Sequence, residues 1–263
     1  MAKSILFDTT KCTGCRGCQV ACKQWNGLKA EATVNTGTYE NPPDLSPDTW
    51  LKMRFTEVGS NGSLAWVFTR RSCMHCTEAA CVKVCPTNAL YHHDLGFVAY
   101  DKNLCSGCGY CVEACPFKVP RMSGSKLTGK GKMEKCLFCR DRVTNGLEPA
   151  CVKTCPTGAL SFGDLPELQT AARAKVEALG GTAQLYGEKE LDGLHVLYIL
   201  SHPPEVLDSE GKTLPVDPKV SDITTAWKDI LQPIGYGVIG LVAVGLALNY
   251  MAARARMTQK EGK

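Results

Sequence analysis

Alternating apolar and polar positions predict several short strands in the first two thirds of the chain. Residues 4–9 form an apolar run at the start. Residues 51–55 alternate, the stretch Ser60-Asn-Gly-Ser63 has turn chemistry, and residues 65–69 are apolar again, which predicts a β-hairpin. Residues 89–101 predict a second hairpin.

After residue 157 the pattern predicts a layer of strands and one helix. Residues 158–163 form a strand pattern, and residues 165–179 form a helix with a proline near its first turn and two glycines after its end. Two further strands are predicted at residues 183–186 and 195–200. These segments indicate an α+β fold.

Four stretches lack a regular pattern and are predicted to be irregular. Residues 31–49 are rich in Thr, Asn, Pro and Gly, and residues 123–131 are rich in Gly, Ser and Lys. Residues 140–150 are expected to form an excursion rather than a helix. The composition after residue 203 turns to Pro, Asp and Lys, which predicts an extended arm.

The last pattern is a long apolar segment, residues 230–253, without a charged residue. About 20 apolar residues span a bilayer as a helix, so this segment predicts a transmembrane helix. Trp227, Tyr236 and Tyr250 lie near its ends, as interfacial aromatic residues do. A buried helix of a soluble protein is the alternative, but such helices seldom run so long without a charge.

The tail that follows is basic, which predicts an orientation. Arg254, Arg256, Lys260 and Lys263 outnumber the single Glu261, and basic flanks stay cytoplasmic. The rest of the chain would then lie on the opposite, periplasmic side of the inner membrane. Since no export signal is recognised at the start, we expect a partner to carry the folded chain across.

Composition narrows the function classes. The net charge of +4 is modest and no basic run suggests nucleic acid. The sequence shows no nucleophile–base constellation and no Gly-rich phosphate loop, so we expect no catalytic residues on this chain. Seven basic residues in or beside the cysteine motifs are expected to offset anionic clusters: Arg16, Lys23, Lys83, Lys118, Arg121, Lys135 and Lys153.

The chemistry of the chain is concentrated in its sixteen cysteines, which fall into four motifs. The spacing resembles that with which bacterial ferredoxins hold [4Fe–4S] clusters, three thiolates on a loop and a fourth at the start of a helix. The first, second, third and fourth motifs are Cys12, Cys15, Cys18, Cys22; Cys73, Cys76, Cys81, Cys85; Cys105, Cys108, Cys111, Cys115; and Cys136, Cys139, Cys151, Cys155.

The fourth cysteine of a ferredoxin motif ligates the cluster of the neighbouring motif. The two middle motifs therefore pair with each other, and the two outer motifs pair across them. The expected ligand sets are Cys12, Cys15, Cys18 with Cys155; Cys136, Cys139, Cys151 with Cys22; Cys105, Cys108, Cys111 with Cys85; and Cys73, Cys76, Cys81 with Cys115.

Other uses of these cysteines fit less well. Disulfide frameworks belong to small secreted domains. The fourth motif alone could form a four-thiolate zinc site, but this would leave Cys22 without a cluster. His75, His92 and His93 could ligate metal, but with the thiolates complete they are expected to be surface residues or neighbours of the ligands.

The resulting fold is α+β, with two pseudo-symmetric ferredoxin-like modules of two [4Fe–4S] clusters each, one inserted in the other, and a C-terminal transmembrane helix. The expected divisions are residues 1–72 for the first half of the outer module, 73–122 for the inserted module, 123–202 for the second outer half, 203–229 for the arm, 230–253 for the membrane helix and 254–263 for the tail.

The cysteine pattern resembles the iron–sulfur subunits of the molybdopterin oxidoreductase family, and several stretches look like those of membrane-bound respiratory formate dehydrogenases of the N type. The stretches that carry this resemblance are Lys11–Cys22, Gly107–Cys111, Cys115–Arg121, Glu148–Ala159, Gly193–Leu200, Leu214–Lys219 and Trp227-Lys228. The resemblance continues into the single terminal membrane helix.

This resemblance implies an electron-transfer subunit in a complex with a molybdenum or tungsten pterin catalytic subunit and a cytochrome b that reduces quinone. It implies a path through the first, fourth, third and second motifs, from the catalytic subunit at Cys12 to the haem at Cys73. Because Cys108 is present, where some relatives have lost a cysteine, four [4Fe–4S] clusters are expected.

Three alternatives stay open at this point. The chain could be the membrane-anchored subunit of a periplasmic nickel–iron hydrogenase, which would share the motifs and the helix. It could serve another molybdopterin reductase. A membrane-anchored iron–sulfur sensor, which would not need four clusters, is the alternative from outside electron transport.

Overall fold

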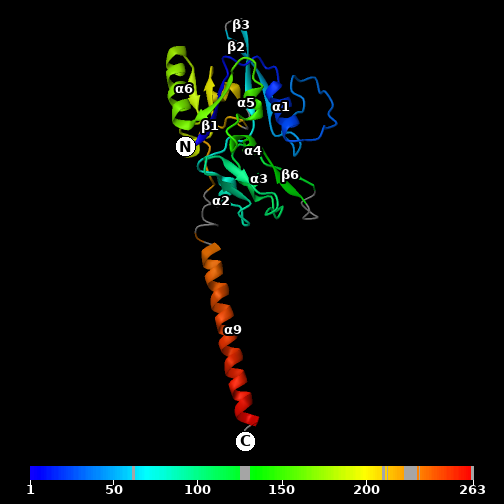
Figure 1. The fold of residues 1–263 in the computed structure, drawn as a ribbon, viewed down its shortest axis with the longest axis vertical. Helices are drawn as coiled ribbons and strands as arrows, with labels where there is room; N and C mark the ends of the chain where they lie inside the picture. Colours follow the sequence, from blue (N-terminus) through cyan, green and yellow to red (C-terminus); the bar gives the residue numbers. More distant parts are fainter. Residues whose placement is uncertain are drawn as a thin grey trace. The chain divides into compact units, whose positions relative to one another are not determined.

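The computed structural model describes residues 1–60, 63–124, 131–208, 211, 213–221, 230 and 232–261. The chain divides into two compact units, Met1–Val220 and Ser221–Lys263. All sixteen cysteines lie in the first unit. The second contains the long helix α9 (Gln232–Glu261); Figure 1 shows both units.

The elements of the first unit are short. Its strands are β1 (Lys3–Asp8), β2 (Lys52–Ser60), β3 (Ser63–Arg71), β4 (Leu90–His92), β5 (Val98–Tyr100), β6 (Arg121–Ser123), β7 (Lys132–Glu134), β8 (Leu160–Asp164), β9 (Gln184–Tyr186) and β10 (Val196–Leu200). Its helices are α1 (Gly17–Trp25), α2 (Ala80–Lys83), α3 (Tyr110–Ala114), α4 (Arg140–Val143), α5 (Ala150–Lys153), α6 (Leu165–Leu179), the 3₁₀ helix η2 (Glu190–Asp192) and α7 (Pro204–Leu207).

A four-stranded sheet joins the beginning of the chain to its later part. The strand order is β8-β1-β10-β9, with β1 antiparallel to β8 and parallel to β10. Side chains alternate across a strand, so Leu6 packs beneath α6 with Leu197, while Ile5 and Phe7 join the core around the cysteine motifs. The sheet therefore separates α6 from the cysteine motifs (Figure 1).

The predicted helix at residues 165–179 is confirmed as α6, with the predicted bounds. It begins after Asp164, has a proline in its first turn and ends before Gly180. Ala172 is fully buried against Leu6 and Ile199. The apolar stripe of this helix thus covers the outer face of the sheet.

Both predicted hairpins are confirmed. Strands β2 and β3 pair from Lys52↔Arg71 to Ser60↔Ser63, and the turn residues Asn61 and Gly62 lie outside the described residues. Strands β4 and β5 form the second hairpin. The predicted loop at 123–131 lies mostly outside the described residues, but β6 and β7 pair on either side of it.

The 31–49 segment contains no helix or strand, as predicted, and is held by ion pairs. Glu40 pairs with the buried Lys52 of β2. Asp44 pairs with Arg71 of β3, at 3.1 Å from Nη1 to Oδ1, and with Arg121 of β6, at 2.9 Å from Nη2 to Oδ2. This loop therefore connects the β2–β3 hairpin to the start of β6.

Two predictions of irregular structure were wrong in part. The spacer of the fourth motif contains the one-turn helix α4, and the predicted extended arm contains α7. The arm is also packed rather than free, because Leu207 and Leu214 are both buried at 1% exposure. Single helical turns of four residues are too short to leave a periodic pattern in the sequence.

Asp208 fixes the arm, and its replacement by asparagine is expected to loosen the arm. Its carboxylate is fully buried, lies 2.7 Å from Arg54 Nη1 and accepts hydrogen bonds from the backbone N–H groups of Thr213 and Leu214. We expect Asp208→Asn to lower the free energy of local opening by about 1.5–3 kcal/mol. Hydrogen exchange at the two amides measures this change.

The control for that variant is Asp217→Asn in the same segment. Asp217 pairs with Lys219 at 2.7 Å, but its side chain is 72% exposed. An exposed ion pair contributes about 0–1 kcal/mol, so exchange at Thr213 and Leu214 should stay near the wild-type rate. Equal acceleration in both variants would mean that Asp208 does not anchor the arm.

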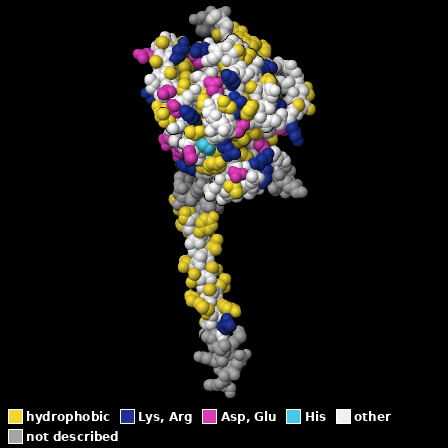
Figure 2. Space-filling model, in the orientation of Figure 1, with side chains coloured by type: hydrophobic (Ala, Val, Ile, Leu, Met, Phe, Trp, Pro, Cys, Tyr) yellow, Lys and Arg dark blue, Asp and Glu magenta, His cyan; other side chains and the backbone are white. Residues whose placement is uncertain are grey.

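Helix α9 has the length and composition of a membrane span. Its segment Pro233–Ala252 has a mean hydropathy of 1.7 and none of it is buried inside the protein. Figure 2 shows hydrophobic side chains along this helix. Tyr236 and Tyr250 are both exposed, whereas the predicted interfacial residue Trp227 lies outside the described residues.

Candidate cluster-binding sites

Each cysteine motif folds as a tight loop that leads into a short helix. The third cysteine lies within the helix in every motif: Cys18 in α1, Cys81 in α2, Cys111 in α3 and Cys151 in α5. The fourth cysteine was expected at a helix start, but Cys85, Cys115 and Cys155 follow the helix ends, and Cys22 lies one turn after Cys18. Four residues are about one helical turn, so third and fourth thiols are displaced along the axis.

The first loop shows why the motif spacing needs glycine. Gly14, between Cys12 and Cys15, has a φ of +66°, and a Cβ atom there would lie 2.9 Å from the ring of Phe68. Its N–H donates to the thiol of Cys12 at 3.5 Å. A side chain at residue 14 would therefore push the loop away from the β2–β3 hairpin.

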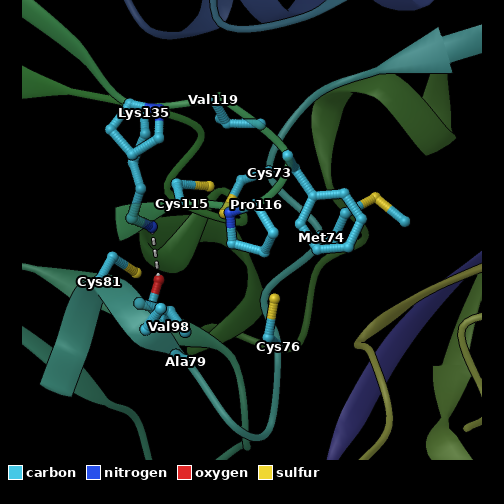
Figure 3. A pocket seen from close by; sticks show the side chains of 13 residues that line it. Cys73, Met74, Cys76, Ala79, Cys81, Val98, Cys115, Pro116, Val119 and Lys135 are labelled. Carbon is cyan, nitrogen blue, oxygen red and sulfur yellow. Dashed lines mark hydrogen bonds between the residues drawn. The ribbon is translucent and has the colours of Figure 1, made fainter. Parts of the chain in front are cut away.

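The second motif surrounds a small apolar cavity. Its thiols are Cys73, Cys76 and Cys81, and the fourth cysteine at the cavity is Cys115 of the third motif. Figure 3 shows the sulfur atoms of Cys76, Cys81 and Cys115 pointing toward one another around this space. Met74, Phe117 and Val119 line the rest and are almost completely buried.

The third motif surrounds a small cavity, where Cys105, Cys108 and Cys111 meet Cys85 of the second motif. Met122 and Met133 line this cavity from β6 and β7. The two middle motifs therefore exchange their fourth cysteines in space.

The fourth motif surrounds another small cavity. Here Cys136, Cys139 and Cys151 meet Cys22 of the first motif, and all four are buried. Ile5, Leu51 and Phe138 close the space. The thiol of Cys22 on α1 thus lies beside cysteines of the fourth motif, which follow it in the chain by more than a hundred residues.

The remaining cysteines, Cys12, Cys15, Cys18 and Cys155, lie near one another beside the fourth-motif cavity. Burial raises the pKa of the Cys12 thiol, and the neighbouring thiolates of Cys15 and Cys155 raise it further. Burial also raises the pKa of Cys18 to about 12, with contributions from Cys151, Cys12 and Cys15. The outer motifs therefore also exchange their fourth cysteines.

Burial dominates the electrostatics of the buried thiols. It raises the pKa of Cys136 to about 11 and that of Cys139 to about 12. It also raises the pKa of Cys22 well above the usual range, with further contributions from Cys136, Cys151 and Cys139. Thiols held in such apolar surroundings bind as thiolates only when positive charge, from iron or from a basic side chain, offsets theirs.

The donor set fits polynuclear clusters. All sixteen cysteines are free thiols rather than disulfides. Among the described residues, no three His, Cys, Asp or Glu side chains converge closely enough to bind a single metal ion. Four thiols spread around an apolar cavity suit a cube in which each thiolate binds a different iron atom, whereas zinc draws its four ligands onto one point.

The cavities follow one another in a definite order. Cys18, Cys151 and Cys73 pack in one core cluster, which brings the first, fourth and second motifs together. Lys135 lines the second-motif cavity, and the next residue, Cys136, lines the fourth-motif cavity. Cys81 of the second motif packs in another cluster with Cys111 of the third. This gives the order first, fourth, second, third. It differs from the path first, fourth, third, second that the family resemblance implied, because the second-motif cavity lies beside the fourth.

Exposure distinguishes the ends of this series from its middle. Cys15 of the first motif and Cys108 of the third are exposed, whereas the four thiols of the fourth-motif cavity are buried. The two end sites are therefore the accessible ones.

The predicted basic residues differ in their surroundings. Lys135 is 1% exposed, lines the second-motif cavity, and donates from Nζ to the carbonyl oxygens of Val98 at 2.8 Å and Cys136 at 3.0 Å (Figure 3). Several others instead form ion pairs away from the cavities, namely Lys23 with Glu31, Lys83 with Glu78 and Arg121 with Asp44.

Sequence reasoning missed Arg70, whereas the histidines include both kinds that it expected, a neighbour of a ligand and a surface residue. Arg70 of β3 lines the fourth-motif cavity and is 1% exposed. His75 is fully buried beside Phe138, so it is no surface residue, whereas His92 is exposed. Nδ1 of His75 lies 3.2 Å from the carbonyl oxygen of Val98.

Family models match most of the chain. Residues 11–89 and residues 64–165 each match a model described as a 4Fe–4S dicluster domain. Residues 220–262 match a model described as the transmembrane part of formate dehydrogenase N.

Whole-length relatives agree with these matches. The iron–sulfur subunit of formate dehydrogenase-O from Escherichia coli is 40% identical over 253 residues, which cover 94% of this chain and 80% of that protein. The formate dehydrogenase iron–sulfur subunit of Haemophilus influenzae is 39% identical, covering 94% of this chain and 79% of the relative. The electron transfer subunit of thiosulfate reductase from Salmonella typhi is 38% identical and covers 71% of this chain.

Proposed function

The chain belongs to the family of formate dehydrogenase iron–sulfur subunits, and from that premise we propose that it conducts electrons from a molybdenum or tungsten pterin catalytic subunit to a membrane cytochrome b and quinone. It is the electron-transfer subunit of a formate dehydrogenase, is anchored in the membrane, and carries four [4Fe–4S] clusters on its two dicluster domains. The catalytic bond-breaking steps belong to a partner subunit.

We propose the crossed ligand sets for the four clusters. Three of them are supported by cavities at which the expected four cysteines meet, and the first by the proximity of Cys12, Cys15, Cys18 and Cys155. Each cluster, when bound, supplies a carrier for one electron. The protein supplies thiolate ligands, and its apolar linings exclude water from all but the end sites.

The observation that carries the proposal is the series of sites with exposed thiols at its two ends only. We propose that electrons enter at the site of Cys15 and leave at the site of Cys108, by way of the fourth-motif and second-motif sites. The exit site is then that of the third motif, whereas the resemblance implied the second-motif site of Cys73. The basic tail supports a periplasmic location of the first unit and a cytoplasmic C-terminus.

The test is anaerobic purification of the complex from membranes with this chain tagged. We expect a molybdenum or tungsten subunit and a cytochrome b to co-purify, about sixteen irons on this chain, and reduction of the clusters within seconds of adding formate. Co-purification of a nickel–iron subunit, with reduction by hydrogen and not by formate, would instead assign the chain to a hydrogenase. An isolated chain with one or two clusters would fit a sensor.

A further inference from the structure

Arg70 is a buried cation that forms no ion pair with a carboxylate of the described residues. Its side chain is 1% exposed, and its Nε and Nη1 donors have no hydrogen-bond partner among the described residues. Its Nη2 lies 3.9 Å from the sulfur of Cys151. Burying a charge without a compensating partner is costly, so the surroundings of this guanidinium must supply negative charge.

The cysteine thiols are the groups that can do so. Arg70 lines the fourth-motif cavity together with Cys22, Cys136 and Cys151. Its cross-strand partner Met53 also contacts Cys18 of the first-motif set, at 3.5 Å between the two sulfur atoms. The guanidinium therefore lies between the first two sites of the series.

Its position is fixed by the strand rather than by a flexible loop. Arg70 pairs with Met53 across the β2–β3 hairpin, and its carbonyl oxygen accepts a 2.6 Å hydrogen bond from the hydroxyl of the buried Tyr198. An arginine guanidinium stays protonated in proteins, so the side chain is a permanent positive charge.

We propose that Arg70 raises the reduction potentials of the fourth-motif and first-motif clusters, with its unpartnered Nε and Nη1 groups available as donors to a bound cluster. The reasoning rests on the proposed function only in requiring clusters at these two sites. A cluster gains one negative charge when it accepts an electron, so a nearby fixed cation stabilises the reduced form. Electrons that enter at the first-motif site would then move to the buried fourth-motif site, which is next in the series.

The experiment replaces Arg70 with methionine, which is of similar length and uncharged, and titrates the clusters in the intact complex by EPR. We expect the potential of the fourth-motif cluster to fall by at least 59 mV, a tenfold change in its reduction equilibrium. The first-motif cluster should fall less, and the second-motif and third-motif clusters should stay unchanged. The fourth-motif signal is identified by its loss in Cys139→Ser.

The matched control is Arg71→Met, one residue further along the same strand. Arg71 is also buried, at 4% exposure, but it points to the opposite face of β3 and pairs with Asp44. This variant should leave the fourth-motif potential unchanged. An Arg70→Met protein with its full iron content and wild-type potentials would overturn the proposal, as would an equal shift in Arg71→Met.

Arg70→Lys keeps the test decisive if the methionine variant does not bind its iron. Lysine keeps the charge but not the forked donors. The lysine variant should therefore bind all four clusters, and its fourth-motif potential should fall by less than half of the fall expected for the methionine variant. The proposal is overturned if the lysine variant does not bind the fourth-motif cluster. It is also overturned if the potential of that cluster falls as far as expected for the methionine variant. Wild-type clusters reduced by formate would leave the proposed function intact in either case.

Discussion

Replacing Cys22 with alanine is expected to remove the cluster of the fourth motif and to leave the cluster of its own motif in place. The purified variant should contain about three quarters of the wild-type iron. The reason is that the thiol of Cys22 meets Cys136, Cys139 and Cys151 at the buried fourth-motif cavity. Iron analysis with EPR of the reduced protein measures both the loss and its location.

Double variants make this test independent of signal assignment. Cys22→Ala combined with Cys139→Ala should lose no more iron than either single variant, because both thiols serve one cluster. Cys22→Ala combined with Cys12→Ala should lose about half of the iron, because two clusters are affected. The reverse pattern, additive with Cys139 and not with Cys12, would show that each motif binds its own four-thiolate cluster.

The loss should also spare the fold. Cys22 lies on α1, whose helix is continued to Trp25 and whose neighbouring core includes Ile5, Leu51 and Phe138. The alanine itself adds no buried polar group, and the thiols of Cys136 and Cys151 remain at the cavity to compensate the charge of Arg70. General loss of all four clusters would therefore be inconsistent with a role for Cys22 as a ligand alone.

In the proposed series of sites, electron transfer depends on the interior sites. The fourth-motif site, with all four thiols buried, lies between the exposed first site and the second-motif site. Removing an interior site interrupts the series, whereas changing Cys108 affects only its exposed end. Cys22→Ala should consequently abolish formate-dependent reduction of the second-motif and third-motif clusters, while dithionite still reduces both.

Local sequence patterns predicted most of the elements, because their periodicity is carried by neighbouring residues. The α6 helix has its proline and glycines at the two ends, and the β2–β3 hairpin alternates on both strands. The pairing of β1 with β8 and β10 is not local, since Ile5 pairs with residues at 162 and 196. No pattern within any one of these strands specifies its partner.

Three of the expected cysteine sets line cavities together, but the order of these cavities differs from the expected path. Cysteine spacing specifies which thiols can share a cavity, and the structure brings the expected cysteines together. The sequence of cavities depends on how the two modules pack, which is expressed in contacts such as Lys135 with Val98. The family analogy therefore exchanged the second and third motifs.

Arg70 shows what a closer reading of the alternation could have found. In β3 the side chains of Trp66, Phe68 and Arg70 share one face, and Phe68 packs at Gly14 of the first cluster loop. That face of the hairpin is therefore directed at the cysteine motifs. The adjacent Arg71 makes this alternation hard to recognise, because two successive arginines at the end of a strand are typical of a solvent-exposed terminus.

Ending the chain after Val220 is expected to release the protein from the membrane almost completely. The division between the two units falls at that residue, and no part of the apolar segment Pro233–Ala252 is buried inside the protein. When the chain is expressed without partner subunits, we expect the full-length protein in the carbonate-resistant membrane fraction. The shortened protein should be in the soluble fraction with its iron content unchanged.

The control removes residues 254–263 only, which deletes the basic tail and keeps the apolar segment Pro233–Ala252. About 20 apolar residues suffice to span a bilayer without the tail, so this protein should remain resistant to carbonate extraction. The tail should instead affect orientation, because flanking basic residues determine which side is cytoplasmic. If the protein shortened to residue 220 stayed with the membrane, the anchor would lie in the cysteine-containing unit, and α9 would have to act as a docking helix for another subunit.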